Sequence, residues 1–161
     1  MVQPRQQSPD DRPRSAESSS KQSRSTWRVL LVEDSPDDLR SLARSLNNAG
    51  ADVTLECNAE AALKRITSAN VDSQCFDVIV TDLRVSGLDG ITMTRRLRKE
   101  CCSVPIVMCS AETDPTAQRL ALEAGCDSFL DQSLAHEDIV THVLRCADNG
   151  KPPRDSNQIQ S

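Results

Sequence analysis

The chain has 161 residues and a formal net charge of −5, enough for one domain of ordinary size with flanking segments. The acidic excess lies between Trp27 and Asp148, which carry twelve basic and twenty acidic side chains. This balance argues against nucleic-acid binding, which needs clustered Lys and Arg. No apolar run reaches the roughly 20 residues of a membrane span, and no signal-peptide core is present. We therefore expect a cytoplasmic protein without a membrane partner.

Composition divides the chain into three parts. Residues 1–26 and 149–161 are rich in Ser, Gln, Pro and Arg and poor in large hydrophobic side chains. Such segments bury too little apolar surface to offset the entropy lost on ordering, so we predict two disordered tails. Residues 27–148 are predicted to form the single folded domain.

The seven cysteines include no CxxC pair and are odd in number. Disulfides are not expected in the cytoplasm, and the spacing does not suit a zinc site. Cys57 and Cys109 fall in predicted strands, where we expect them to be small buried hydrophobic residues. Nothing near the vicinal pair Cys101-Cys102 indicates a lowered thiol pKa.

The first predicted strand is the apolar run 29–32, which ends at the acidic pair Glu33-Asp34. A helix follows, with Ser35 as its N-cap and Pro36 in its first turn. Leucine and alanine side chains then recur at helical spacing, which indicates a face packed against a core.

The second strand is predicted at 53–57, and Asn58 is expected to cap the helix after it. The third strand, 78–81, is Val-Ile-Val-Thr, a composition typical of a strand buried on both faces. Asp82 stands where this strand should end. A Gly-containing turn follows Asp82.

The third helix is predicted from Gly90 to Glu100 and the fourth strand at 104–109, followed by Ser110. The fourth helix is expected over 115–124, ending at Gly125, because Gly commonly terminates helices. The third helix is expected to bury Ile91, Thr94, Leu97 and Cys101.

The fifth strand is predicted at 128–131, and the fifth helix after Ser133. Five alternating strand and helix segments predict an α/β fold with a parallel, doubly wound, five-stranded sheet and helices on both faces. No output module such as a helix-turn-helix is recognisable.

Polar side chains follow three of these strands: Glu33 and Asp34, Asp82, and Ser110. In parallel sheets, ligands bind at the carboxyl ends of the strands. Three crowded carboxylates repel one another unless a cation is bound, and Mg²⁺ prefers such oxygen ligands. Asp82 would then be a nucleophile for a phosphoryl group. The alternative is that each acid merely caps a helix, which is the usual role of a lone Asp.

The motifs LLVEDSPDD, TDLRVSGLDG, PIVMCSAE and AGCDSFL together resemble the receiver domain of two-component response regulators. The resemblance covers residues 27–148 and implies a flavodoxin-like fold with strand order 2-1-3-4-5. It implies that Asp82 accepts a phosphoryl group from a sensor histidine kinase or a histidine phosphotransfer protein. Mg²⁺ would be held by Glu33, Asp34, Asp82 and the backbone carbonyl of Arg84.

The resemblance also implies a switch in which Ser110 moves toward the phosphoryl group and Phe129 swings inward. Such a switch would signal to an unknown downstream protein through the face formed by the fourth helix, the fifth strand and the fifth helix. For Phe129, ordinary core packing is the alternative. The domain would catalyse only its own phosphorylation and dephosphorylation, so it is not expected to be an enzyme in the usual sense.

The sequence departs from the family pattern at three positions. Gln132 and Ser133 stand where the family has a Lys-Pro pair, and Ser86 stands where it usually has Pro. Replacing Lys by Gln removes a positive charge from the phosphoryl site, a loss of about 1–3 kcal/mol. Without Pro, a cis bond before residue 133 is not expected. We expect phosphorylation to persist while signalling is weakened or rerouted.

Arg84 and Glu112 lie two residues beyond Asp82 and Ser110, beside the path of the attacking water in this family. We predict an Arg84–Glu112 ion pair that slows hydrolysis of the acyl phosphate. His136 and His142, six residues apart, are expected to be surface residues without a catalytic role.

The leading hypothesis is a stand-alone receiver controlled by phosphorylation. The second is a pseudo-receiver that binds partners without phosphorylation, which Gln132 and Ser133 favour. An aspartyl-phosphate phosphatase would carry its nucleophile after the first strand in a DxD pattern, which is missing there. A flavin site would need a Ser/Thr-rich phosphate loop in the same place.

Overall fold

The structure is a computed structural model that describes residues 26–68 and 76–150. Five parallel strands form one sheet in the order β2-β1-β3-β4-β5, which confirms the predicted α/β fold. The strands are β1 (Arg28–Val32), β2 (Asp52–Glu56), β3 (Val78–Thr81), β4 (Ile106–Ser110) and β5 (Ser128–Asp131). The helices are α1 (Pro36–Asn48), α2 (Ala59–Thr67), α3 (Gly90–Lys99), α4 (Pro115–Ala124) and α5 (His136–Asn149).

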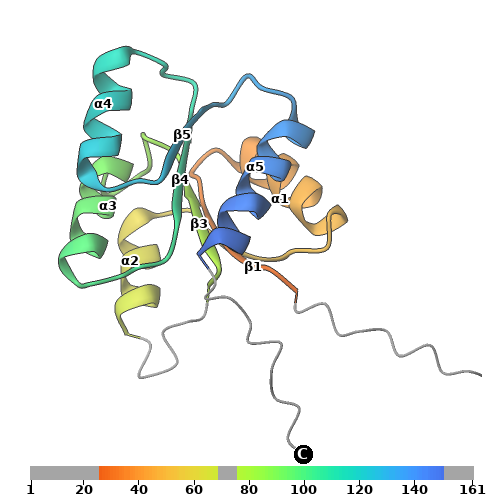
Figure 1. The fold of residues 1–161 in the computed structure, drawn as a ribbon, viewed down its shortest axis with the longest axis horizontal. Helices are drawn as coiled ribbons and strands as arrows, with labels where there is room; N and C mark the ends of the chain where they lie inside the picture. Colours follow the sequence, from red (N-terminus) through yellow and green to blue (C-terminus); the bar gives the residue numbers. More distant parts are fainter. Residues whose placement is uncertain (1–25, 69–75, 151–161) are drawn as a thin grey trace, which may run out of the picture.

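The helices cover both faces of the sheet, as Figure 1 shows: α1 and α5 lie on one face, and α2, α3 and α4 lie on the other. Alternate residues of each strand point to opposite faces. In β1, Val29 and Leu31 therefore pack toward α1 and α5, while Leu30 and Val32 pack toward α2 and α3.

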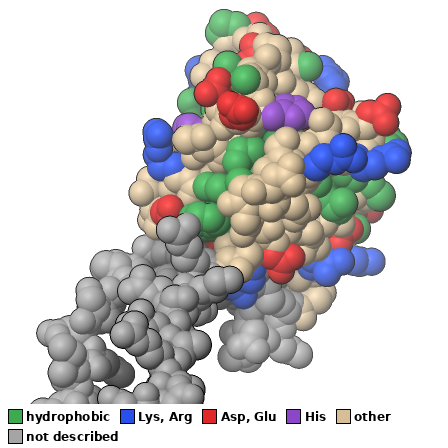
Figure 2. Space-filling model, turned by 90° about the vertical axis from the view of Figure 1, so that its right-hand side faces the viewer, with side chains coloured by type: hydrophobic (Ala, Val, Ile, Leu, Met, Phe, Trp, Pro, Cys, Tyr) green, Lys and Arg blue, Asp and Glu red, His purple; other side chains and the backbone are tan. Residues whose placement is uncertain are grey.

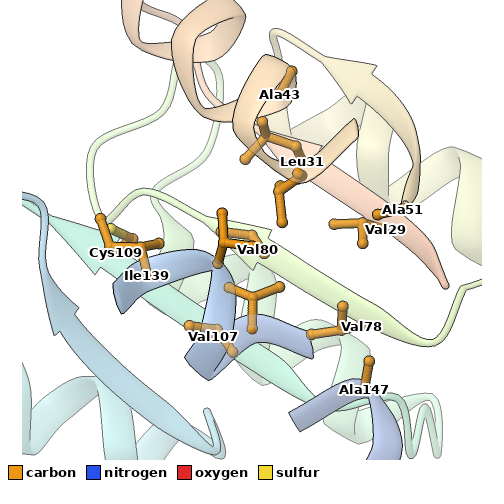
Figure 3. Close-up of a cluster of buried hydrophobic side chains, with 13 residues drawn as sticks. Val29, Leu31, Ala43, Ala51, Val78, Val80, Val107, Cys109, Ile139 and Ala147 are labelled. Atoms are coloured by element: carbon orange, nitrogen blue, oxygen red, sulfur yellow. The ribbon is translucent and has the colours of Figure 1, made fainter. Parts of the chain in front are cut away.

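Figure 3 shows the core between the sheet and the α1–α5 pair, in which Leu31 of β1, Val80 of β3 and Ile139 of α5 belong to one buried cluster. Every residue of β3 is buried, so this strand is the centre of both cores. Fully burying one such side chain contributes about 1.5–3 kcal/mol. The central strand therefore fixes the position of Asp82, the residue that follows it.

Several predicted boundaries and burial assignments are wrong in detail. β4 begins at Ile106 rather than at residue 104, and Pro105 contributes only its carbonyl, which accepts a hydrogen bond from the Ile79 N–H. Cys57 follows β2 and is exposed, whereas Cys109 is buried as predicted. In α3, Thr94 and Leu97 are buried as predicted, but Ile91 is only partly buried. Cys101 lies beyond the helix and is exposed.

Helices α1, α3 and α4 end in the same hydrogen-bonded motif. A residue with positive φ follows each helix: Gly50 (φ 92), Cys101 (φ 60) and Gly125 (φ 106). In each case its N–H and the next N–H bond to carbonyls of the last turn, which is the Schellman arrangement. Cys101 alone adopts this left-handed conformation with a side chain, at a cost that Gly avoids.

The α5 helix includes Asn149, one residue beyond the predicted domain boundary at Asp148. The remainder of both predicted tails lies outside the described residues, apart from residue 26 and Gly150, and so does the predicted loop at 70–74. None of the described helices is long and apolar enough to cross a membrane. On the face drawn in Figure 2, basic side chains are interspersed with acidic ones.

Candidate functional site

A cavity of about 60 Å³ opens at the carboxyl ends of the strands. It is large enough for a few water molecules or a hydrated ion. Glu33 enters it from the end of β1, Asp82 from the end of β3, and Gln132 from the end of β5. Asp38 from α1 and His136 from α5 also line its wall. The structure thus brings three of the predicted site residues together at one cavity.

Asp82 is held in place by a hydrogen bond from its own turn, because the Leu83 N–H donates to Asp82 Oδ1 over 2.6 Å. The Ser110 side chain and the Arg84 N–H act, like this bond, to lower the pKa of the carboxyl. Burial raises the pKa of Asp82 overall, although these hydrogen bonds oppose the shift. Asp82 is therefore a partly desolvated carboxylate on a rigid strand end, as a nucleophile requires.

A glycine is required beside this turn. The Gly90 N–H donates to the Leu83 carbonyl, and a Cβ at position 90 would collide with the Asp82 carbonyl oxygen. The N-cap of α3, Asp89, accepts from the Thr92 N–H over 2.8 Å. The sequence Leu88-Asp89-Gly90 therefore lets α3 begin directly against the Asp82 turn.

Glu33 is the most perturbed acid at the cavity. Its side chain is buried, and burial raises its pKa from 4.5 to about 7. A hydrogen bond from the Ser35 N–H, 2.9 Å long, opposes this shift, while the charges of Asp82 and Asp34 add to it. Ser35 occupies the predicted N-cap position of α1, but its side chain makes no capping hydrogen bond.

Asp34 contacts the loop between β3 and α3. Its Oδ2 accepts hydrogen bonds from the Ser86 N–H at 3.1 Å and from the Ser86 hydroxyl at 2.8 Å. Within the described part of the chain, Asp34 does not line the cavity. Among these residues no group of three or more His, Cys, Asp or Glu side chains converges as metal ligands would. The predicted set of Glu33, Asp34 and Asp82 is thus only partly assembled.

The donor chemistry nevertheless fits a hard divalent cation. Glu33 and Asp82 offer only oxygen atoms, and both carboxyl groups have raised pKa values because they are buried near like charges. A divalent cation would relieve this repulsion, and Mg²⁺ commonly uses one or two carboxylates together with water. The two cavity carboxylates and Asp34 therefore fit Mg²⁺ by chemistry.

The predicted Arg84–Glu112 ion pair is present, with Arg84 Nε 2.7 Å from Glu112 Oε2. Both side chains are exposed, Arg84 by 78% and Glu112 by 40%. The Glu112 N–H also donates to Ser110 Oγ over 3.1 Å. The pair thus connects the loops that follow β3 and β4. Its effect on hydrolysis stays a prediction.

Gln132 and Ser133 form a compact turn after β5. The Gln132 N–H donates to the Ser110 carbonyl over 2.9 Å, which joins the ends of β5 and β4. The Ser133 N–H, a donor that Pro would lack, bonds to Asp131 Oδ1 over 2.8 Å. The Ser133 side chain and this N–H lower the pKa of that carboxyl. No peptide bond in the described residues is cis.

Phe129 is half-buried and packs against the cluster that includes Met108 and Ala121. This is the core packing named as the alternative to a switch role. Inward movement of Phe129 remains a prediction.

The sequence analysis missed Asp38 and His136 as cavity residues. His136 Nδ1 lies 3.3 Å from Ser45 Oγ and 3.5 Å from Ser41 Oγ, so the ring contacts α1. The sequence position of His136 could have indicated its place at the cavity, because it lies in the first turn of α5, four residues beyond Gln132. His142 lies elsewhere on α5, with Nε2 2.8 Å from Ser128 Oγ.

The sequence profile of the response regulator receiver domain matches residues 29–144. Transcriptional regulatory protein PrrA of Mycobacterium leprae is 32% identical over 119 residues, which cover 74% of this chain and 49% of PrrA. Response regulator MprA of Mycobacterium avium is 31% identical over 133 residues, covering 82% and 56%. The chain thus spans about half the length of these curated relatives.

Solved structures show the same fold. The receiver domain of the Francisella response regulator 1452 superposes with a TM-score of 0.71 at 25% identity, covering 78% of this chain and all of that domain. A response regulator receiver domain protein from Methanospirillum hungatei, at 19% identity, gives 0.70 and covers 78% of this chain and 97% of its own. This second likeness concerns the fold alone.

Proposed function

This chain belongs to the response regulator receiver family, and on that premise we propose that Asp82 accepts a phosphoryl group from a phosphohistidine. Receiver domains are phosphoacceptor signalling modules rather than conventional enzymes. The donor would be a sensor histidine kinase or a histidine phosphotransfer protein. The observation that carries the proposal is the placement of Asp82 at the end of the central strand, facing a cavity shared with Glu33.

In the transfer step, an Asp82 carboxylate oxygen bonds to phosphorus while the nitrogen–phosphorus bond of the donor histidine breaks. The leaving imidazole nitrogen takes a proton from solvent, and Asp82 becomes an acyl phosphate. The Leu83 N–H, 2.6 Å from Oδ1, orients the carboxylate for this attack. The rigid β3 strand supplies the positioning on which phosphoryl transfer mainly depends.

Mg²⁺ would be held by Glu33, Asp34, Asp82 and the Arg84 carbonyl, and when bound it would offset the charge of the phosphoryl oxygens. The Ser110 side chain acts on the Asp82 carboxyl, whose pKa it lowers, and would donate to a phosphoryl oxygen after transfer. Gln132 lines the same cavity and offers amide hydrogens without a charge. We therefore expect slower phosphorylation than a cationic side chain at this position would allow.

The test is incubation of the full chain with a small-molecule phosphodonor with and without Mg²⁺, followed by intact mass measurement. Wild type should gain the mass of one phosphoryl group only with Mg²⁺. Asp82→Asn, checked for folding by circular dichroism, should gain none. Equal labelling of the two proteins would refute the assignment.

The second candidate is a pseudo-receiver that binds a partner protein without phosphorylation. The specific observation in its favour is the uncharged Gln132 at the cavity wall. A phosphorylation-independent module would bind its partner equally well as wild type and as Asp82→Asn. Signalling to a downstream protein through protein–protein contacts is part of the same proposal, whether the receiver acts alone or within a longer regulator.

A further inference from the structure

Ser86 makes two hydrogen bonds to the same oxygen of Asp34. Its backbone nitrogen lies 3.1 Å and its hydroxyl oxygen 2.8 Å from Asp34 Oδ2. Within the described part of the chain, Oδ1 of this carboxylate accepts no hydrogen bond. Pro at position 86 would supply neither donor, because Pro has no N–H and no hydroxyl. The contact is therefore a property of this chain's own sequence.

The loop that carries Ser86 is also fixed at α2. The Ser86 carbonyl accepts a hydrogen bond from the Ala59 N–H, 3.3 Å long, at the start of α2. At the next residue, Gly87 has φ +88, and a Cβ there would lie 3.1 Å from Asn58 Nδ2. Ser86 is thus held between α2 and Asp34, and its donors are in place before any cation binds.

Asp34 acts on both acids of the cavity. Burial raises the pKa of Glu33 and of Asp82 the most, and the negative charge of Asp34 adds to both shifts. The three carboxylates therefore form one electrostatic group, whose mutual repulsion a divalent cation would relieve. Asp34 can offer Oδ1 to such a cation while Oδ2 keeps both bonds from Ser86.

We infer that Ser86 is a positioning residue that raises the divalent-cation affinity of the site by holding the Asp34 carboxylate with Oδ1 free for the cation. The inference rests on the proposed function, because it concerns the same cation site. Hydrogen bonds that persist in both states do not compete with the cation. They orient the ligand in advance, whereas a carboxylate without them loses rotational freedom on binding. Partners that orient a metal ligand in this way typically change metal affinity by about 10- to 100-fold.

The test uses the full chain, with Mn²⁺ as the probe, because Mn²⁺ shares the preference of Mg²⁺ for oxygen ligands. Calorimetry and electron paramagnetic resonance measure the affinity, and circular dichroism checks that each variant folds. Ser86→Ala keeps the N–H but loses the hydroxyl bond, so it should bind Mn²⁺ about tenfold more weakly. Ser86→Thr keeps a hydroxyl and should bind as wild type does. Ser103→Ala, an exposed serine at the opposite edge of the sheet, is the matched control and should also bind as wild type does.

A double-mutant cycle shows whether Ser86 acts through Asp34. Asp34→Ala removes the carboxylate, so Ser86→Ala should cause no further loss of Mn²⁺ affinity in that background. A loss that persists without Asp34 would overturn the inference and leave the proposed function intact. Unchanged or tighter binding by Ser86→Ala alone would have the same meaning. No Mn²⁺ binding by wild type would instead overturn the cation site itself, and the inference with it.

Discussion

Arg98 Nε lies 2.9 Å from the carbonyl oxygen of Gly125 and donates a hydrogen bond to it. The same guanidinium bonds to the carbonyls of Cys102 and Val104 and to Asp127 Oδ2 at 2.9 Å. Asp127 Oδ2 in turn accepts from the Ile106 N–H. One side chain therefore joins the end of α3 to the segments that enter β4 and β5.

We expect Arg98→Met to lower the free energy of unfolding by about 2–4 kcal/mol, because several carbonyls lose a charged donor. Arg98→Lys should recover only part of this loss, since an ammonium group cannot reproduce the fork of donors. Arg96→Ala, an exposed neighbour on the same helix, should change stability by less than about 0.5 kcal/mol. Urea unfolding followed by circular dichroism measures all three, and equal effects of R98M and R96A would contradict the role of Arg98.

Cys101→Gly is expected to stabilise the protein by about 0.5–1 kcal/mol. Cys101 adopts φ 60 in a motif where α1 and α4 use glycine, so glycine would relieve the left-handed strain. Glu100 precedes it with φ −88, and Glu100→Gly should therefore destabilise. Thermal melts of both variants provide the comparison. A lower melting temperature for C101G would show that the cysteine side chain contributes more than its backbone strain costs.

The free energy of unfolding should depend on pH because of Glu33. Its pKa is raised on folding from 4.5 to about 7, so the folded state binds the extra proton. The associated stability is fully present below pH 4.5 and is lost as the pH rises through about 7. In chelator, Glu33→Gln should remove this decline and be more stable above pH 7 by about 1–3 kcal/mol.

Thermal melts from pH 4.5 to 8.5 in chelator test this prediction. Glu123→Gln, on the exposed side of α4, is the control and should keep the wild-type decline. A wild-type protein whose stability rises steadily over this interval, with no difference in Glu33→Gln, would rule out Glu33 as the source.

Loss of the Arg84–Glu112 ion pair should accelerate hydrolysis of the acyl phosphate. The pair is exposed and connects the loops after β3 and β4, beside Asp82. Exposed pairs contribute about 0.2–1 kcal/mol, which corresponds to about a 1.5- to 5-fold faster loss of phosphate in Arg84→Ala. The time course of dephosphorylation by intact mass, with Glu112→Gln and the double variant, measures the coupling. Identical half-lives of the acyl phosphate in wild type, the two single variants and the double variant would show that the pair does not slow hydrolysis.

The five strands and five helices follow from hydrophobic patterns and caps in the sequence, whereas the strand order was implied by the resemblance to receiver domains. Runs of apolar residues such as 78–81 are suited to the buried centre of a sheet. Asn58 caps α2 with its side-chain oxygen, as predicted. Boundaries were less accurate where a residue suits two roles. Pro105 is compatible with the start of a strand, yet it lies before β4.

The sequence predicted which residues lie at the strand ends, but it did not predict which contacts their side chains make. Asp82 follows a central strand, so its location depends on the fold alone. The orientation of Asp34 depends on a hydroxyl 52 residues away in sequence, and the entry of His136 into the cavity depends on how α5 packs against α1. Such contacts between distant loops and helices have no periodic signal in the sequence.

The Arg98 contacts lie where the chain enters β4 and β5, whereas the cavity lies where β1, β3 and β5 end. Because whole strands separate the two edges, substitutions at one edge act nearly independently of the other. Exchanging Gln132 and Ser133 for the Lys-Pro pair of the family pattern should thus need no compensating change around Arg98. The chemistry at the carboxyl edge of the sheet can therefore change without endangering the fold.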